Sequence, residues 1–211
     1  AENSLFCVSG SANEELIRVS SEANFELHWI QAELSETLSI EAFMETIAER
    51  IDTEGPSSIT LINNAALLSP MGLVGASSAD DIQQAVQVNL MAPMVLTHSF
   101  VRHFGTTRCR RTIINVSSGA GVSPMPGLST YSATKAALNM FTQACAAEHG
   151  DDSPGAPLRF YAVSPGTVDT SMQEALRSAG QSVLPNHDTY VEWKETGSLA
   201  GPAEAARAVL T

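Results

Sequence analysis

The order of apolar and amphipathic segments constrains the fold of this 211-residue chain more than any other feature. Five short apolar runs are typical of strands, at residues 4–8, 25–30, 58–62, 112–116 and 158–163. Helical periodicity alternates with them, at residues 13–21, 40–52, 79–104, 131–148 and 170–179. Strands that alternate with helices pair in parallel through crossover helices. The chain therefore predicts an α/β fold with a doubly wound parallel sheet, and residues 1–211 are enough for one domain with a sizeable core.

Three side chains suited to proton transfer lie close together in the sequence. Tyr131 and Lys135 are four residues apart in a helical segment, and Ser118 stands thirteen residues before Tyr131, just after the apolar run at 112–116. Side chains at this helical spacing share one face, about 5–6 Å apart at Cβ. An ammonium at about 4 Å would supply roughly 4 kcal/mol at an effective dielectric of about 20, and a phenol with a pKa of about 10 needs roughly that much to ionise near neutral pH. Such a phenol can protonate a carbonyl oxygen or deprotonate an alcohol, while Ser118 would hydrogen-bond the same oxygen.

The spacing of Tyr131 and Lys135 does not establish this chemistry alone, because many helices carry a tyrosine and a solvated lysine one turn apart. Four further stretches add to the set: AEL at 32–34, NNAA at 63–66, VNL at 88–90 and SPGTVDT at 164–170. With these residues in this order, the chain resembles the short-chain dehydrogenase/reductase family over nearly its whole length. Within the family, PGTVDTSMQ at 165–173 and WKETGSL at 193–199 most resemble the sepiapterin reductase and benzil reductase branch.

The resemblance implies a role for each matching residue. Asn89 would hold a water in a proton relay behind Lys135, although a helix-interior amide that only satisfies backbone groups is the structural alternative. Asn63 and Ala65 match the turn after the family's fourth strand, where the backbone packs beside the adenine ribose and the central sheet, and Tyr131 and Lys135 would also contact the cofactor. The loop expected to cover the nicotinamide contains Pro165, Gly166, Thr167, Val168 and Thr170. Asp169 and Gln173 would face the substrate, together with Ser118 and Tyr131.

Parts of the family pattern are absent from both ends of the chain. Family members begin with a strand and a Gly-rich turn, whose glycines let the backbone approach the pyrophosphate. This chain has no such turn, and its first strand-like run corresponds to the family's second strand. We therefore expect the first strand, its Gly-rich turn and the last strand to lie outside the chain, because a sheet without its first strand would expose apolar edges.

The cofactor is expected to be NADP rather than NAD. An acidic residue at the end of the second family strand binds the ribose of NAD, whereas basic residues accommodate the 2′-phosphate of NADP. The corresponding stretch CVSGSANE at 7–14 has no acidic residue at the strand end, and Ser11 stands where sepiapterin reductases carry an arginine. A serine can donate to a phosphate but brings no charge. Glu33 replaces the family aspartate that meets the adenine amino group, and Leu34 follows it.

Composition excludes several other functions. The net charge of −12 argues against nucleic acid, since such binding relies on clusters of Lys and Arg, and we interpret the basic run RCRR at 108–111 as a solvated loop. The three cysteines fit neither a disulfide framework nor a zinc site, and the five histidines lack ligand spacing, so we expect no metal and a reduced setting. No segment approaches 18 apolar residues and no leader opens the chain, which predicts a soluble, cytoplasmic protein without a membrane partner.

The remaining segments predict a lid and an oligomer. Residues 181–199 look irregular and would form a lid or substrate loop, or else simply pack through Tyr190 and Trp193. Residues 150–157, GDDSPGAP, form a polar loop. The helices at 79–104 and 131–148 are apolar on more than one face, and in this family such helices commonly form a four-helix interface. A homodimer or homotetramer is therefore expected.

The interpretation as a whole is an NADP-dependent carbonyl reductase acting on a ketone or diketone, sepiapterin-like or benzil-like, with Tyr131 as general acid. A non-catalytic family member used for binding or regulation, and an NAD-linked alcohol dehydrogenase, are the alternatives. The sequence does not name the physiological substrate, because specificity depends on loops rather than on the fold.

Overall fold

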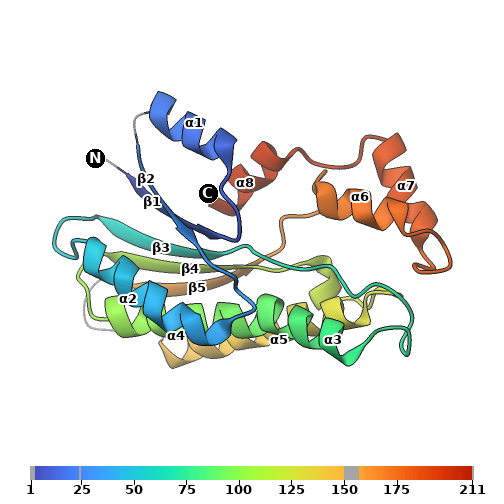
Figure 1. Cartoon of the computed structure of the whole chain (residues 1–211), viewed down its shortest axis with the longest axis horizontal. Helices are drawn as coiled ribbons and strands as arrows, with labels where there is room; N and C mark the ends of the chain where they lie inside the picture. The colour runs from blue at the N-terminus through green and yellow to red at the C-terminus, as the bar shows by residue number, and fades with distance from the viewer. Residues whose placement is uncertain (1–2, 24, 150–156, 211) are drawn as a thin grey trace.

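The computed structural model describes residues 3–23, 25–149 and 157–210, and Figure 1 shows how its elements are arranged. Of the predicted polar loop at 150–157, only Pro157 is among the described residues. The strands are β1 (Ser4–Ser9), β2 (Glu26–Gln31), β3 (Ser58–Asn63), β4 (Arg110–Val116) and β5 (Leu158–Val163). The α-helices are α1 (Glu14–Ala23), α2 (Ile40–Arg50), α3 (Ala79–Val86), α4 (Ala92–Phe104), α5 (Ser129–Glu148), α6 (Ser171–Ser178), α7 (His187–Glu195) and α8 (Pro202–Leu210). Three single-turn elements complete the list: η1 (Thr37–Ser39), η2 (Gln87–Met91, a π-helix) and η3 (Gly119–Gly121).

All strand pairs are parallel, as the alternation of strands and helices predicts. β1 pairs with β2, and Ser9 lies opposite Gln31 at their carboxyl ends. β4 lies between β3 and β5, with its Asn115 opposite Asn63 on one side and Ala162 on the other. The described strands thus form a two-stranded and a three-stranded sheet. They do not test whether further first and last strands complete one sheet, and that expectation stays a prediction.

The main core lies between the three-stranded sheet and the helices α2, α4 and α5, which cover one of its faces in Figure 1. Alternate residues of β4 point to this face, so Ile113 is fully buried between the strands and the helices. Phe100 and Phe104 of α4 lie in the same cluster. Burying such side chains contributes about 1.5–3 kcal/mol each. This packing fixes α5 against β4 and thereby positions the residues at the end of each.

The interpretation of RCRR at 108–111 as a solvated loop is wrong for its second half. Arg110 and Arg111 are the first residues of β4, and Arg111 points to the helical face with only 2% of its surface exposed. Its guanidinium donates to the carbonyls of Phe104 and Gly105 at the end of α4. These carbonyls have no partner within the helix, and a cation is favourable there because of the helix dipole. The alternation of strand faces therefore buries a charge where composition alone predicts exposure.

Three helical segments differ from the predicted ones. The predicted helix at 79–104 is interrupted by the π-helix at Gln87–Met91, between α3 and α4. Residues 181–199, predicted to be irregular, contain α7 (His187–Glu195). The sequence prediction missed α8, where Pro202 occupies the first helical position, a position that tolerates proline because its N–H would be unpaired anyway.

Candidate active site

Ser118 is placed by the turn that follows β4. The strand ends at Val116, and Ser118 is the N-cap of the short helix η3. Its Oγ accepts a hydrogen bond from the backbone N–H of Ala120 at 3.2 Å, which is the usual role of an N-cap serine. The hydroxyl hydrogen therefore remains free to be donated to another group.

Tyr131 lies in the first turn of α5 and is buried, with 7% of its surface exposed. Burial raises the pKa of its phenol above the usual 10.0, and a hydrogen bond with the Ser118 side chain offsets part of that shift. The turn after β4 and the first turn of α5 thus place the Ser118 hydroxyl near the Tyr131 phenol, and the catalytic roles of the two residues stay a prediction. The phenol keeps its proton at neutral pH, so in this geometry it is a proton donor.

Lys135 lies one turn further along α5, with 2% of its surface exposed. Its Nζ donates to the carbonyl oxygen of Val116 at 2.8 Å and lies 5.7 Å from the centroid of the Tyr131 ring. Burial lowers the pKa of the ammonium to about 8. The sequence analysis expects this charge to act directly on the phenol, but here burial dominates the pKa of Tyr131 and the ammonium is directed at Val116. The ammonium nevertheless lies 5.7 Å from the ring centroid, so its positive charge favours a phenolate at Tyr131.

Asn89 lies at the centre of the π-helix between α3 and α4 and is fully buried. Its Oδ1 accepts from the N–H of Leu67 at 2.7 Å, and its Nδ2 donates to the carbonyl of Leu67 at 2.8 Å. Nδ2 also lies 3.3 Å from Oγ1 of Thr134, on the helix that carries Tyr131 and Lys135. π-helical turns occur mostly at functional sites. The amide satisfies backbone groups, as the structural alternative holds, and it also joins the loop after β3 to α5.

The residues expected to hold the cofactor lie at the carboxyl ends of the strands. Ser11 follows β1, and Glu33 and Leu34 follow β2. A side chain at Gly10 would lie 2.5 Å from Oε1 of Glu33, so this carboxylate rests against the backbone beside Ser11. Ala65 follows β3 and is exposed. The loop residues Pro165, Gly166, Thr167, Val168 and Thr170 all follow β5.

The side chain of Asn63 faces the core, and the prediction that the backbone here packs beside the adenine ribose stays a prediction. Its Nδ2 donates to Oδ1 of Asn115 at 2.7 Å and lies 3.4 Å from Oγ1 of Thr97. Asn115 in turn donates to Thr142 of α5 at 2.8 Å. The sequence analysis missed Asn115 and Thr142, although polar residues in a strand and a helix that are otherwise buried were a signal. These bonds tie β3, β4 and α5 together beneath the site.

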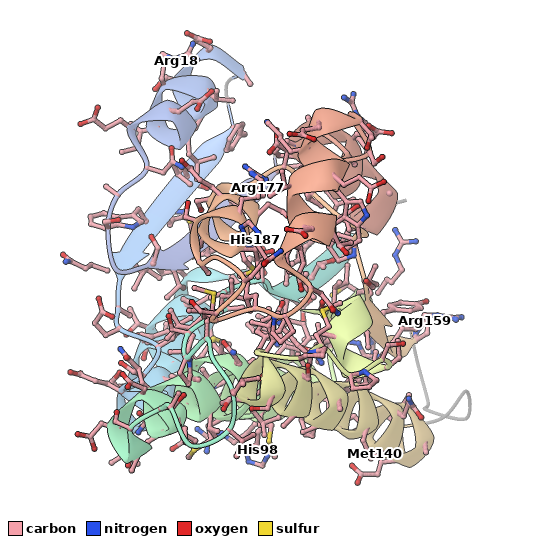
Figure 2. All side chains as sticks on the ribbon, turned by 90° about the vertical axis from the view of Figure 1, so that its right-hand side faces the viewer. Arg18, His98, Met140, Arg159, Arg177 and His187 are labelled. Atoms are coloured by element: carbon pink, nitrogen blue, oxygen red, sulfur yellow. The ribbon has the colours of Figure 1, made fainter. Side chains whose placement is uncertain are left out.

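The carboxylate of Asp169 forms ion pairs with two basic side chains, one in α6 and one in α7. Its carboxylate accepts from Nζ of Lys194 in α7 at 2.6 Å and lies 3.8 Å from Arg177 of α6. The Lys194 hydrogen bond is the main cause that lowers the pKa of Asp169. His187 of α7 lies 2.7 Å from the carbonyl of Arg177, and Figure 2 shows the two side by side. The predicted substrate residue Asp169 therefore also links α6 to α7.

An apolar cluster surrounds the Tyr131 ring. It joins Tyr131 to Leu128 and Leu68, to Leu176 of α6, and to Leu184 and Tyr190 of residues 181–199. The predicted substrate residue Gln173 belongs to the same helix as Leu176 and is buried, and its Oε1 has no hydrogen-bond partner among the described residues. Tyr190 and Trp193 of residues 181–199 pack in or against this cluster, as the alternative of simple packing holds, and a lid role for the segment stays a prediction. The sequence analysis did not single out Leu184 or Leu128.

The donor groups around this edge fit a nicotinamide cofactor. An exposed hydroxyl and a carboxylate stand at the ends of β1 and β2, and a buried ammonium stands beside the phenol at the end of β4. Ligands of open parallel sheets bind beyond the carboxyl ends of the strands. Ser11 and Glu33 would hold the adenosine end, whereas Lys135 and the loop at 165–170 would hold the nicotinamide end.

Comparison with known proteins points to the same family. The model of the short chain dehydrogenase family matches residues 2–181. The benzil reductase ((S)-benzoin forming) of Bacillus cereus is 34% identical over 202 residues, which cover 96% of this chain and 80% of that protein. The sepiapterin reductase of Bos taurus is 27% identical over 215 residues, covering 97% of this chain and 77% of that protein. The crystal structure of the KRED1-Pglu enzyme shows the same fold, with a TM-score of 0.78 at 24% identity over 98% of this chain and 82% of that one. The chain therefore belongs to the short-chain dehydrogenase/reductase family, in the branch that includes benzil and sepiapterin reductases.

Proposed function

We propose that the protein is an NADP-dependent carbonyl reductase that converts a ketone or diketone to an alcohol. The observation that carries the proposal is the burial of the Tyr131 phenol one helical turn from the buried ammonium of Lys135, which lies 5.7 Å from the Tyr131 ring centroid. When bound, the reduced cofactor supplies the hydride that the carbonyl carbon accepts. The raised pKa of Tyr131 keeps its phenol protonated, so it can act as a general acid.

Each residue of the site has a defined part in this proposal. Ser118 donates to the carbonyl oxygen and holds it near the phenol, from which the oxygen takes its proton. The positive charge of the Lys135 ammonium stabilises the phenolate left behind. The apolar cluster around Tyr131 excludes water and suits the aryl groups of a benzil-like diketone. Asn89 would hold the water through which the phenol regains a proton from solvent.

Replacing Tyr131 by Phe tests this proposal, because it keeps the ring and removes the proton. We expect the purified protein to oxidise NADPH in the presence of benzil or sepiapterin, and the variant to lose at least about 100-fold in kcat, the lower range for general acid catalysis. Tyr161→Phe is the matched control, since Tyr161 lies in β5 and 44% of its surface is exposed. Turnover that survives in the Tyr131 variant would show that the phenol is not the acid.

One observation favours the NAD-linked alternative. The carboxylate of Glu33 rests against Gly10 beside Ser11, and a negative charge there would oppose the 2′-phosphate of NADP. The two cofactors should be compared at equal concentration in the wild-type protein and in Glu33→Gln. NADPH preferred by the wild type supports our proposal, whereas activity with NADH alone would favour the alternative. Thermal shifts with either cofactor separate both enzymes from a non-catalytic protein that binds neither.

We also propose that the protein is a homodimer or homotetramer. Helices α4 and α5 each expose methionines on the side away from the sheet, with 39% of the Met94 surface and 65% of the Met140 surface accessible. His98 and Met140 lie along this outer side in Figure 2. Light scattering of the wild type and of Met94→Glu tests this interface. Among the described helices none could cross a membrane. We propose a cytoplasmic location on a separate ground, because Cys7, Cys109 and Cys145 are free thiols, which suit a reducing compartment.

A further inference from the structure

The turn that carries Ser118 lies unusually close to the helix that carries Tyr131. A Cβ atom placed on Gly121 would lie 2.9 Å from the carbonyl carbon and 3.0 Å from the carbonyl oxygen of Lys135. It would also lie 2.7 Å from Nδ2 of Asn139, one turn further along α5. The two contacts with Lys135 are to backbone atoms of a helix, which cannot rotate away. Only a glycine therefore allows η3 to rest on α5 at this distance.

The close approach, and not the backbone conformation, makes glycine necessary here. Gly121 is not among the glycines with a positive φ, so another residue could adopt its backbone angles. The turn is otherwise well bonded: the N–H of Gly121 donates to the carbonyl of Ser118 at 2.9 Å. Nδ2 of Asn139 donates to the carbonyl of Gly121 at 3.3 Å. The segment from Ser118 to Gly121 thus moves as one unit against α5.

Lys135 lies against the chain on both sides of Ser118. The ammonium binds the carbonyl of Val116, two residues before Ser118, and the backbone of the same lysine touches Gly121, three residues after it. The position of the Ser118 hydroxyl relative to Tyr131 is therefore set by how closely the turn fits the backbone at Lys135. We propose that Gly121 is a positioning residue, whose missing side chain holds the Ser118 hydroxyl within hydrogen-bond reach of the Tyr131 phenol. This inference rests on the proposed reductase function.

The substitution Gly121→Ala tests the inference by adding one methyl group. To move from 2.9 Å to an ordinary contact of 3.4 Å, the turn must shift by about 0.5 Å away from α5. Because a 1 Å misplacement can cost about 100-fold in rate, we expect kcat with NADPH and benzil to fall by about 10-fold. Gly119→Ala is the matched control, since a Cβ on Gly119, in the same turn, meets no atom within 4 Å. Its kcat should stay within about twofold of the wild type.

Two further measurements separate positioning from general damage. In the Ser118→Ala background, Gly121→Ala should cause little additional loss, because two changes that act through one group are not additive. The pKa of Tyr131, measured as the ultraviolet titration difference between each protein and its Tyr131→Phe version, should rise in Gly121→Ala and not in Gly119→Ala. This titration needs no turnover, so it tests the positioning role even if the wild type proves inactive with ketones.

Several results would overturn the inference. Wild-type kcat in Gly121→Ala would do so, and so would an equal loss in Gly119→Ala or a full additional loss in the Ser118→Ala background. If Gly121→Ala does not fold, Asn139→Ala replaces it, because that variant removes the hydrogen bond to the Gly121 carbonyl and leaves the backbone contact in place. A smaller rise in the pKa of Tyr131 would then support the role, and an unchanged pKa would contradict it.

Discussion

Replacing Lys135 by Met should change how stability depends on pH. Lys135 is almost fully buried, and its pKa is lowered from 10.5 to about 8. This difference corresponds to a cost of about 3 kcal/mol for keeping the ammonium charged in the folded state. Methionine has a similar length and carries no charge, so it removes this cost. It also removes the donor to the Val116 carbonyl, and an unsatisfied buried acceptor costs about 1–3 kcal/mol.

The pH dependence separates these two effects. Below pH 8 Lys135 is charged in both the folded and the unfolded protein, so the full cost is present and constant. Between about 8 and 10.5 the unfolded chain binds more protons than the folded one, and stability therefore rises with pH. Above 10.5 the amine is neutral in both states. The lost hydrogen bond to Val116 shifts the difference between the two proteins by a constant and does not produce this slope.

The assay is urea unfolding of the cofactor-free wild type and of Lys135→Met, followed by circular dichroism at several pH values from 7 to 10.5. Other groups titrate in this range, but they do so in both proteins and cancel in the difference. We expect the stability of the wild type to rise by about 3 kcal/mol relative to the variant across this window. A difference that stays flat with pH would show that Lys135 is not desolvated in the folded state.

Three further variants test other parts of the structure. Asn89→Ala leaves the N–H and the carbonyl of Leu67 without their side-chain partner, so urea unfolding should show that the free energy of unfolding falls by about 2–4 kcal/mol. Its control Asn64→Ala, at an exposed position, should leave this free energy almost unchanged. Arg111→Met removes the guanidinium donors to the carbonyls of Phe104 and Gly105 and should lower the free energy of unfolding by about 1–3 kcal/mol. An equal decrease in Arg110→Met, at the exposed neighbouring position, would contradict the capping role of Arg111. Asp169→Asn breaks the ion pairs with Lys194 and Arg177 and should speed proteolysis of the lid and raise KM more than it lowers kcat. In the wild type these ion pairs should persist on acidification until Asp169, whose pKa is lowered, becomes protonated. If Asp169→Asn is cleaved no faster than the control Glu192→Gln, which changes an exposed carboxylate of α7, Asp169 does not link α6 to α7.

The parts of the structure that follow from local periodicity could be predicted from the sequence. All five strands lie within two residues of the predicted ends, because short apolar runs between helices leave few alternatives. The placement of Ser118 just after β4 and of Tyr131 in the first turn of α5 also follows from the sequence, since a strand end and the start of the next helix meet at one edge of a parallel sheet. The π-helix around Asn89 was not, because it keeps the helical periodicity of its neighbours. Its cause is the pair of hydrogen bonds with Leu67, a contact between distant segments.

Which polar side chains are buried was the property that could least be predicted from the sequence. Arg111 stands in a run of basic residues that predicts exposure, yet the twofold alternation of β4 turns it toward α4. Asn63 matches a family motif, but its side chain bonds Asn115 inside the sheet. In both cases the direction of the side chain depends on strand register, which composition does not contain. The lowered pKa of Lys135 could not be predicted for the same reason, because it results from burial, which depends on tertiary packing.

The two halves of the site are built in different ways, and this bears on how the site can vary. The catalytic half comes from one continuous segment, in which Lys135 bonds Val116 and Asn139 bonds Gly121 across fewer than twenty residues. The expected cofactor half comes from the ends of separate strands in two sheets, such as Ser11 after β1 and Ala65 after β3. Substitutions at 117–139 would therefore act on the proposed proton donor, and substitutions at the strand ends on the expected cofactor half. Under the proposed function, residues 181–199, which are joined to the site through Asp169 and the cluster around Tyr131, would select the carbonyl compound.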